Sequence, residues 1–163
     1  MYRNIRGRPT TRKEYMGGVP GSRITQFNLG NQEEDFPIKL FLVVEEQCQI
    51  LNRALEAARV AANRYIGNRA GRLNYFMKVL VYPHVVVREN KQATGAGADR
   101  VSQGMRAAYG KPVNTVARVG AGQKIITIET TEANAEHARM ALKRAKSKLP
   151  SPCRVEMQLR KPA

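Results

Sequence analysis

The chain has 163 residues, with 28 Lys and Arg against 13 Asp and Glu, a formal net charge of +15 and a pI near 10.4. A charge of this size favours a polyanionic partner, either nucleic acid or an anionic membrane surface. The Arg-rich start has no apolar run behind it, and no run of about 18 apolar residues occurs, so we expect neither a signal peptide nor a membrane span.

Residues 1–23 predict a basic, extended arm without a core of its own. Gly and Pro interrupt the segment, no apolar period is present, and the only acidic residue is Glu14. Tyr2 and Tyr15 lie among the cations and could stack on bases. The arm is therefore an RNA contact or a solvated tail, and its cations are Arg3, Arg6, Arg8, Arg12, Lys13 and Arg23.

Strand patterns occupy residues 24–29 and 38–45. In the second, Ile38, Leu40, Leu42 and Val44 share one face. The link between them holds an acidic cluster, residues 33–35, with no neighbouring His. A solvent-facing turn explains this cluster better than a metal or acid–base site.

Residues 45–66 predict a helix. Apolar residues recur at spacings of three and four, and Gly67 suits a left-handed stop after them. The cations near this stripe project away from it, and they are Arg53, Arg59, Arg64, Arg69 and Arg72. They could meet phosphates, or hold only solvent and Glu56.

A strand is expected over residues 73–82, followed by Pro83 at a corner or sheet edge and a further strand over 84–88. The next stretch, residues 88–115, is a long basic loop rich in Gly and Ala between two apolar runs. Loops of this length inside compact domains are usually functional or disordered. Its cations are Arg88, Lys91, Arg100, Arg106 and Lys111.

Gly95 and Gly97 resemble the start of a dinucleotide-binding fingerprint, but Arg100 stands where the third glycine belongs. RNA contact therefore fits this loop better than a nucleotide-dependent enzyme does.

Cys48 and Cys153 form no C-x-x-C pair, and His84 and His137 lie far from both. We expect two buried thiols, no metal and no cofactor.

Strands over residues 113–119 and 123–130 flank Gly120-Ala121-Gly122, which predicts a hairpin. Thr131 is a candidate cap of the helix that follows. Opposite its apolar stripe this helix carries the cations Arg139, Lys143, Arg144, Lys146 and Lys148. A half-buried strand over 153–160 ends the chain. The order predicts a single α+β domain over residues 24–163, one mixed or antiparallel sheet with two helices packed on one side.

Family resemblance rests on the loop. The runs 93–100 (ATGAGADR), 104–106 (GMR) and 110–112 (GKP), then 115–119 (TVARV), resemble the large-subunit ribosomal protein L-sixteen family in its archaeal and eukaryotic form, called L-ten-e. Tyr2-Arg3, Gly18-Val19-Pro20, the run 55–59 (LEAAR) and Arg144-Ala145-Lys146 fit the same family. The resemblance covers essentially the whole chain, and its end at Ala163 favours an archaeal source.

The resemblance implies an α/β-hammerhead fold and a structural, non-enzymatic constituent of the large ribosomal subunit. Its implied partners are large-subunit rRNA near five-S rRNA, tRNA and neighbouring ribosomal proteins, in the cytoplasm and without a membrane or small-molecule substrate. The loop would reach the tRNA cleft near the peptidyl transferase centre and would be disordered without tRNA. Loop residues that match the family motif are Gly97, Ala98, Asp99, Arg100, Gly104, Met105, Arg106, Gly110, Lys111 and Pro112.

We therefore predict that the arm and the basic helix surfaces bind rRNA. A free-standing RNA-binding module outside the ribosome is the alternative. The rRNA-binding prediction names Tyr2, Arg3, Arg6, Arg8, Arg12, Lys13, Arg23, Arg59, Arg64, Arg69, Arg139, Lys143 and Lys146, and the tRNA-cleft prediction names Arg88, Lys91, Gly97, Arg100, Arg106, Gly110 and Lys111.

Overall fold

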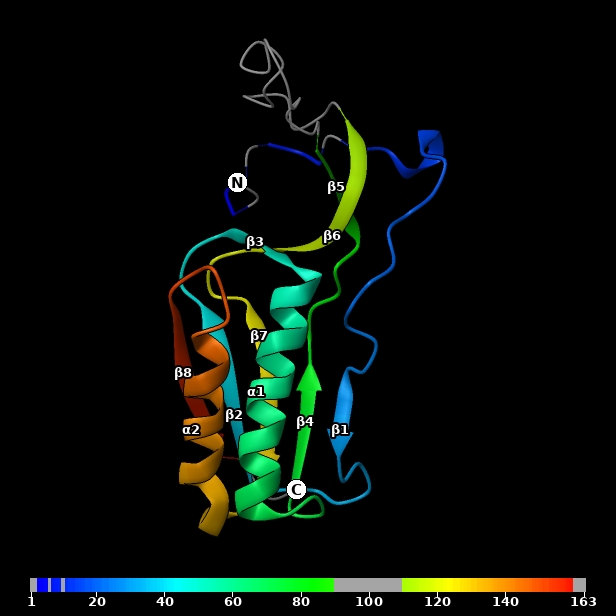
Figure 1. The fold of residues 1–163 in the computed structure, drawn as a ribbon. Helices are drawn as coiled ribbons and strands as arrows, with labels where there is room; N and C mark the ends of the chain where they lie inside the picture. The colour runs from blue at the N-terminus through cyan, green and yellow to red at the C-terminus, as the bar shows by residue number, and fades with distance from the viewer. Residues whose placement is uncertain (1–2, 6, 10, 90–109, 160–163) are drawn as a thin grey trace, which may run out of the picture.

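A computed structural model describes residues 3–5, 7–9, 11–89 and 110–159 of the chain. Its strands form two antiparallel sheets (Figure 1). The larger has the order β1-β4-β7-β2-β8, from β1 (Asn28–Gly30), β4 (Tyr75–Val79), β7 (Lys124–Thr130), β2 (Ile38–Val44) and β8 (Cys153–Leu159). The smaller has the order β3-β6-β5, from β3 (Cys48–Leu51), β6 (Lys111–Val119) and β5 (Val85–Glu89).

Two helices, α1 (Asn52–Ala70) and α2 (Ala135–Lys146), cover one face of the five-stranded sheet (Figure 1). Leu40, Met77 and Ile128 share the inner face of the sheet and bury their side chains beneath the helices. Small residues such as Ala58 and Ala138 let the helices approach the sheet and each other. The predicted α+β class with two helices on one side is confirmed, although the strands divide between two sheets.

The smaller sheet explains why the helix starts later than its pattern suggests. Cys48 and Ile50 are buried as alternate residues of β3, which pairs with β6 through Ile50 and Ala117. This pairing takes the first residues of the expected helix, so α1 begins at Asn52. The expected stop at Gly67 is also wrong, because α1 continues to Ala70 and the positive φ of 79° belongs to Gly71.

The expected hairpin over residues 113–130 is wrong as well. β6 pairs with β3 and β5, whereas β7 pairs with β2 and β4. The Gly120–Gly122 turn therefore carries the chain from one sheet to the other, with Gly122 at a φ of 78°. Pro83 lies in the opposite passage, between β4 and β5, so the predicted corner is confirmed.

Three element bounds differ from expectation in smaller ways. The first strand, β1, is short and overlaps only the last two residues of the expected range 24–29, and β4 is shorter than residues 73–82. The Thr131 hydroxyl forms no cap bond to a backbone N–H. It accepts a hydrogen bond from Asn134 Nδ2 at 3.2 Å, and a 3-10 turn, η3 (Glu132–Asn134), precedes α2.

The described part of the arm lies against the smaller sheet. The Gln49 N–H donates to the Arg3 carbonyl at 2.8 Å, so the arm pairs with β3. Arg118 of β6 donates to the Gly7 carbonyl, and a 3-10 turn, η1 (Lys13–Tyr15), follows. The chain enters the core at Ile24, which is 2% exposed.

Neither α1 nor α2 is long and apolar enough to cross a membrane, and the described residues hold no other candidate.

Candidate nucleic-acid interface

A hollow of about 690 Å³ lies along the outer surface of α1. We call it the α1 groove. Its apolar floor is Ala57, Val60 and Ala61, which α1 presents to solvent on one side. The groove is completed by Arg23, Arg53, Glu56, Arg64, Asn114 and Lys148.

The cations of the groove come from three separate segments. Arg53 and Arg64 lie eleven residues apart on α1, about three helical turns, so both project to the same side. Arg23 comes from the end of the arm, and Lys148 follows α2. The fold therefore concentrates positive charge that is scattered in the sequence.

Among the described residues, Glu56 is the one carboxylate that lines the groove, and it already has a partner. Arg59 Nε donates to Glu56 Oε2 at 2.8 Å, and a second guanidinium nitrogen bonds the other oxygen. This hydrogen bonding lowers the pKa of Glu56 and raises the pKa of Arg59. Arg23, Arg53, Arg64 and Lys148 form no salt bridge with another described residue.

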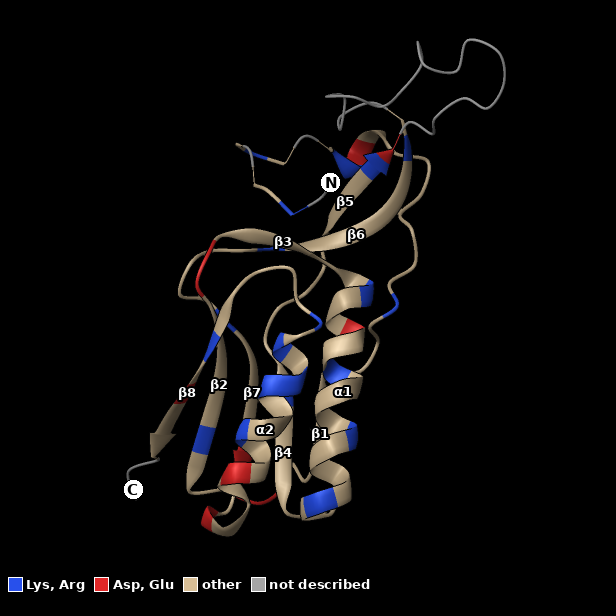
Figure 2. Cartoon of the chain, turned by 60° about the vertical axis from the view of Figure 1, so that its left-hand side comes forward, with Lys and Arg blue, Asp and Glu red and all other residues tan. Residues whose placement is uncertain are grey.

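The positive surface continues beyond the groove. A second hollow of about 360 Å³ shares Val60 and Arg64 with it and adds Arg59, Arg72 and Tyr75. The first turn of α1 holds no acidic residue, so the partial positive charge of the helix N-terminus adds to that of Arg53. Figure 2 shows Lys and Arg positions spread along the length of α1 and α2.

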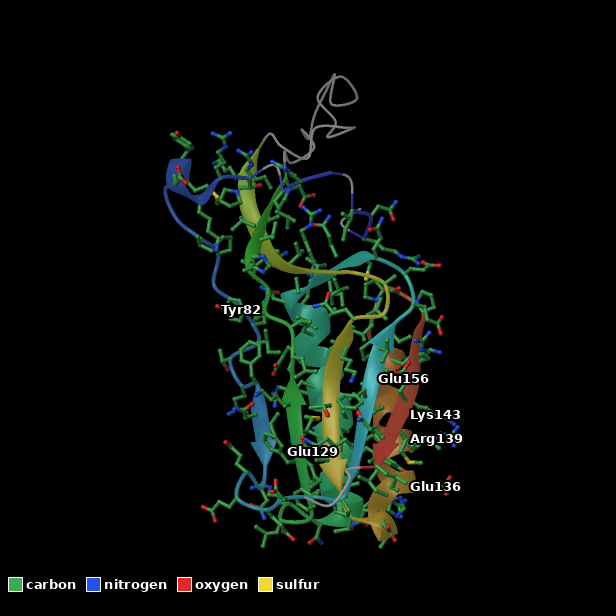
Figure 3. The ribbon with its side chains drawn as sticks, turned by 180° about the vertical axis from the view of Figure 1, so that it is seen from behind. Tyr82, Glu129, Glu136, Arg139, Lys143 and Glu156 are labelled. Atoms are coloured by element: carbon green, nitrogen blue, oxygen red, sulfur yellow. The ribbon has the colours of Figure 1, made fainter. Side chains whose placement is uncertain are left out.

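The predicted rRNA-binding residues divide among three surfaces. Arg23 and Arg64 line the α1 groove, Arg59 holds Glu56 beside it, and Arg69 is exposed near the end of α1. Arg139 and Lys143 lie on the side of α2 next to β8 (Figure 3), and Lys146 is exposed at the end of α2. Tyr2 and Arg6 lie outside the described residues, and the arm near the smaller sheet contributes the exposed cations Arg3, Arg8, Arg12 and Lys13.

The predicted tRNA-cleft loop is anchored by two paired strands. β5 extends to Glu89 and β6 begins at Lys111, so Arg88 and residues 111–115 belong to strands and the expected loop bounds are too wide. Arg88 lies opposite Pro112, and Gly110 has a φ of 116°. The Arg88 Nε is buried without a hydrogen-bond partner among the described residues. Lys91, Gly97, Arg100 and Arg106, and the expected disorder, fall outside the described residues.

The predicted rRNA-binding set does not include Arg53, Arg72, Asn114 or Lys148, although the helix patterns place the three cations among these on outward surfaces. The spacing from Arg53 to Val60 and Arg64 is a helical period, so the sequence could have grouped Arg53 with Arg64. Asn114 and Lys148 carry no such signal, because only the packing of β6 and α2 around α1 brings them to the groove.

The described residues give little support for a catalytic nucleophile or for a metal site. Burial raises the pKa of the Cys48 thiol and raises that of Cys153 to about 11, so both stay protonated near neutral pH. No group of three His, Cys, Asp or Glu side chains that could bind a metal ion occurs in the described part of the chain.

Sequence comparison shows that the chain is similar to ribosomal proteins. A sequence model described as ribosomal protein L16p/L10e matches residues 5–156. The large ribosomal subunit protein uL16 of Methanocella arvoryzae is 58% identical over 97% of this chain and 92% of its own length. The proteins of the same name from Thermoplasma volcanium and Archaeoglobus fulgidus are 54% and 49% identical, over 95% and 97% of this chain and 88% and 90% of their own lengths.

These relatives are archaeal, in line with the form of the family that the loop motif resembles. A family of ribosomal proteins also agrees with the prediction that this chain is not an enzyme. The match of the family model over most of the chain places the protein in the ribosomal protein L16p/L10e family.

Proposed function

We propose that this chain is a structural constituent of the large ribosomal subunit and binds large-subunit rRNA through the α1 groove. The observation that carries the proposal is the convergence of Arg23, Arg53, Arg64 and Lys148 around a groove whose single carboxylate is held by Arg59. The names of its relatives as large-subunit proteins support the ribosomal setting.

The groove suits a strand of RNA chemically. Arginines bind phosphate oxygens with two parallel hydrogen bonds, and each neutralised phosphate releases counterions. The apolar floor around Val60 can receive a ribose or an unstacked base, and the Asn114 amide can both donate and accept hydrogen bonds. The groove therefore offers contacts to both the backbone and the base of one nucleotide.

The arm, residues 1–23, is proposed as a second rRNA anchor beside the domain, residues 24–163. Its start is fixed to the smaller sheet by the bonds of Arg3 and Gly7, while Arg8, Arg12 and Lys13 remain exposed. An anchored basic segment loses less conformational freedom on binding than a free one does. The family resemblance implies that the chain as a whole binds rRNA near five-S rRNA and neighbouring ribosomal proteins.

The loop between β5 and β6 is proposed to reach the tRNA cleft and to support accommodation of tRNA. Two paired strands hold its ends, with Arg88 and Lys111 at its base. A rigid support of this kind fixes the position from which a basic loop projects. The same proposal assigns tRNA contacts to Lys91, Gly97, Arg100, Arg106 and Gly110.

Sedimentation of the tagged full-length chain from an archaeal cell extract tests the ribosomal role. We expect migration with the large subunit at low salt and release as salt rises, because phosphate contacts dominate the affinity. A chain lacking residues 1–13 should leave the subunit at lower salt than the full chain does. A protein that binds RNA but never migrates with the large subunit would instead be a free-standing RNA-binding module.

A further inference from the structure

The two outer strands of the five-stranded sheet differ in length, and the longer one lacks the residues that usually prevent a further strand from pairing at a sheet edge. β1 has only three residues, Asn28–Gly30. β8 has seven residues and pairs with β2 in continuous register, from Leu159 opposite Ile38 to Cys153 opposite Val44. It contains no Pro, Gly or Lys, the residues that commonly blunt a sheet edge. Its other side has no partner strand in the described part of the chain.

Apolar side chains are exposed beside this free strand. Met157 and Leu159 are 62% and 64% exposed, although they lie opposite the buried residues Leu40 and Ile38 on the helix-covered face. Met140 of α2 is 39% exposed and lies one turn from Glu136, which Figure 3 shows on the β8 side of α2. We call Met140, Met157, Leu159 and the free backbone of β8 the β8 edge.

We propose that the β8 edge binds an extended segment of another protein, which adds a further strand to the sheet. The unpaired N–H and C=O groups of β8 match those of an extended chain, and the exposed apolar side chains match alternate residues of that chain. RNA offers neither a backbone ladder nor apolar side chains. The α1 groove and the β8 edge therefore serve different partners, and this proposal does not depend on rRNA binding at the groove.

The charges around the β8 edge specify the partner further. Arg154 is held by Glu156 at 2.7 Å, whereas Arg139 and Lys143 form no salt bridge with another described residue. Glu136 lies on the same side of α2 and offsets part of this charge, but the two cations leave the β8 edge net positive, which an acidic segment would complement. A second copy of the chain would bring its own Arg139 and Lys143 and a further charge of +15 to the contact, which disfavours self-association.

Site-specific cross-linking from Met157 tests the proposal in cells. The tagged full-length chain carries p-benzoylphenylalanine in place of Met157, and cross-linked peptides are identified by mass spectrometry after irradiation. The control position is Leu73, which is 73% exposed and lies between α1 and β4. We expect cross-links from position 157 to a defined acidic segment of one other protein, and none to that segment from position 73.

Changing the apolar side chains provides a second test. With the cross-linker at Met140, the substitutions Met157→Glu and Leu159→Glu should reduce the yield about tenfold or more, because apolar residues at the centre of an interface dominate binding. The matched variant Lys78→Glu changes an exposed strand residue distant from the β8 edge and should leave the yield unchanged. Equal yields from the two variants would overturn the proposal.

Hydrogen exchange tests the strand addition itself. In the purified complex, alternate backbone amides of residues 153–159 should exchange more slowly than in the free chain, because one set of N–H groups gains partners. Unchanged exchange, a cross-link to RNA that ribonuclease removes, or a cross-link to a second copy of this chain would each contradict the proposal. Loss of subunit migration with these cross-links retained would count against the ribosomal role alone.

Discussion

Removal of three groove cations tests the RNA interface quantitatively. The variant combines Arg53→Ala, Arg64→Ala and Lys148→Ala, all exposed residues that form no salt bridge with another described residue. If each neutralises one phosphate, the slope of log K against log salt should fall by about 2 to 3 units. The same slope implies that affinity near 0.1 M salt falls by roughly two decades and that the difference vanishes near 1 M.

The assay is filter binding of the full-length chain to homologous large-subunit rRNA over a series of KCl concentrations. The matched control removes Lys78, Lys124 and Arg154, which changes net charge equally. Lys124 lies over the Phe41 ring and Arg154 is paired with Glu156, and these residues line neither hollow of α1. If both variants lose the same slope, total charge rather than the groove determines binding, and our interpretation of the groove is refuted.

Three further predictions concern the fold, the thiols and the loop. Gly30→Ala should destabilise the chain by about 2 kcal/mol or more in urea unfolding, since φ is +89° and a Cβ would lie 2.2 Å from the Tyr75 carbonyl oxygen. Gly120→Ala, which meets nothing within 4 Å, is the control, and equal losses would contradict this reasoning. The Cys153 thiol, with a pKa of about 11, should react slowly with a thiol reagent at pH 8 and faster as pH rises toward that value. Rapid reaction of the folded chain at pH 8 would show that the thiol is accessible. Replacing Arg100, Arg106 and Lys111 by Ala should leave subunit incorporation nearly intact and slow peptide synthesis; lost incorporation with normal synthesis in the subunits that form would exclude the proposed loop role.

The periodicity of apolar residues correctly predicted those helices and strands whose packing against neighbouring elements favours the same structure. The stripe through Leu55, Ala58 and Ala62 lies against the sheet as its helical period requires, and β2 buries alternate residues. Prediction failed where the partner strand decides the structure. Cys48 fits a helical period with Leu51 and Leu55 and a strand period with Ile50, and only the pairing with β6 selects the strand.

The candidate site shows the same division. The acidic residue Glu56 and its partner Arg59 are three residues apart on one helix, so the helical spacing alone brings them together. Lys148 and Asn114 reach the groove from elements distant in sequence. A turn that carries the chain from one sheet to the other likewise has no local sequence signature. For this reason the Gly120–Gly122 turn resembled a hairpin.

Cross-linking of native large subunits tests the central claim most directly. Irradiation with ultraviolet light followed by mass spectrometry identifies peptides joined to rRNA nucleotides. We predict that peptides containing Arg53, Val60 or Arg64 of α1 carry rRNA nucleotides, because these residues line the α1 groove. Subunits that contain the chain but yield rRNA cross-links only from the opposite face of the sheet, at Lys39 or Lys78, would contradict the account.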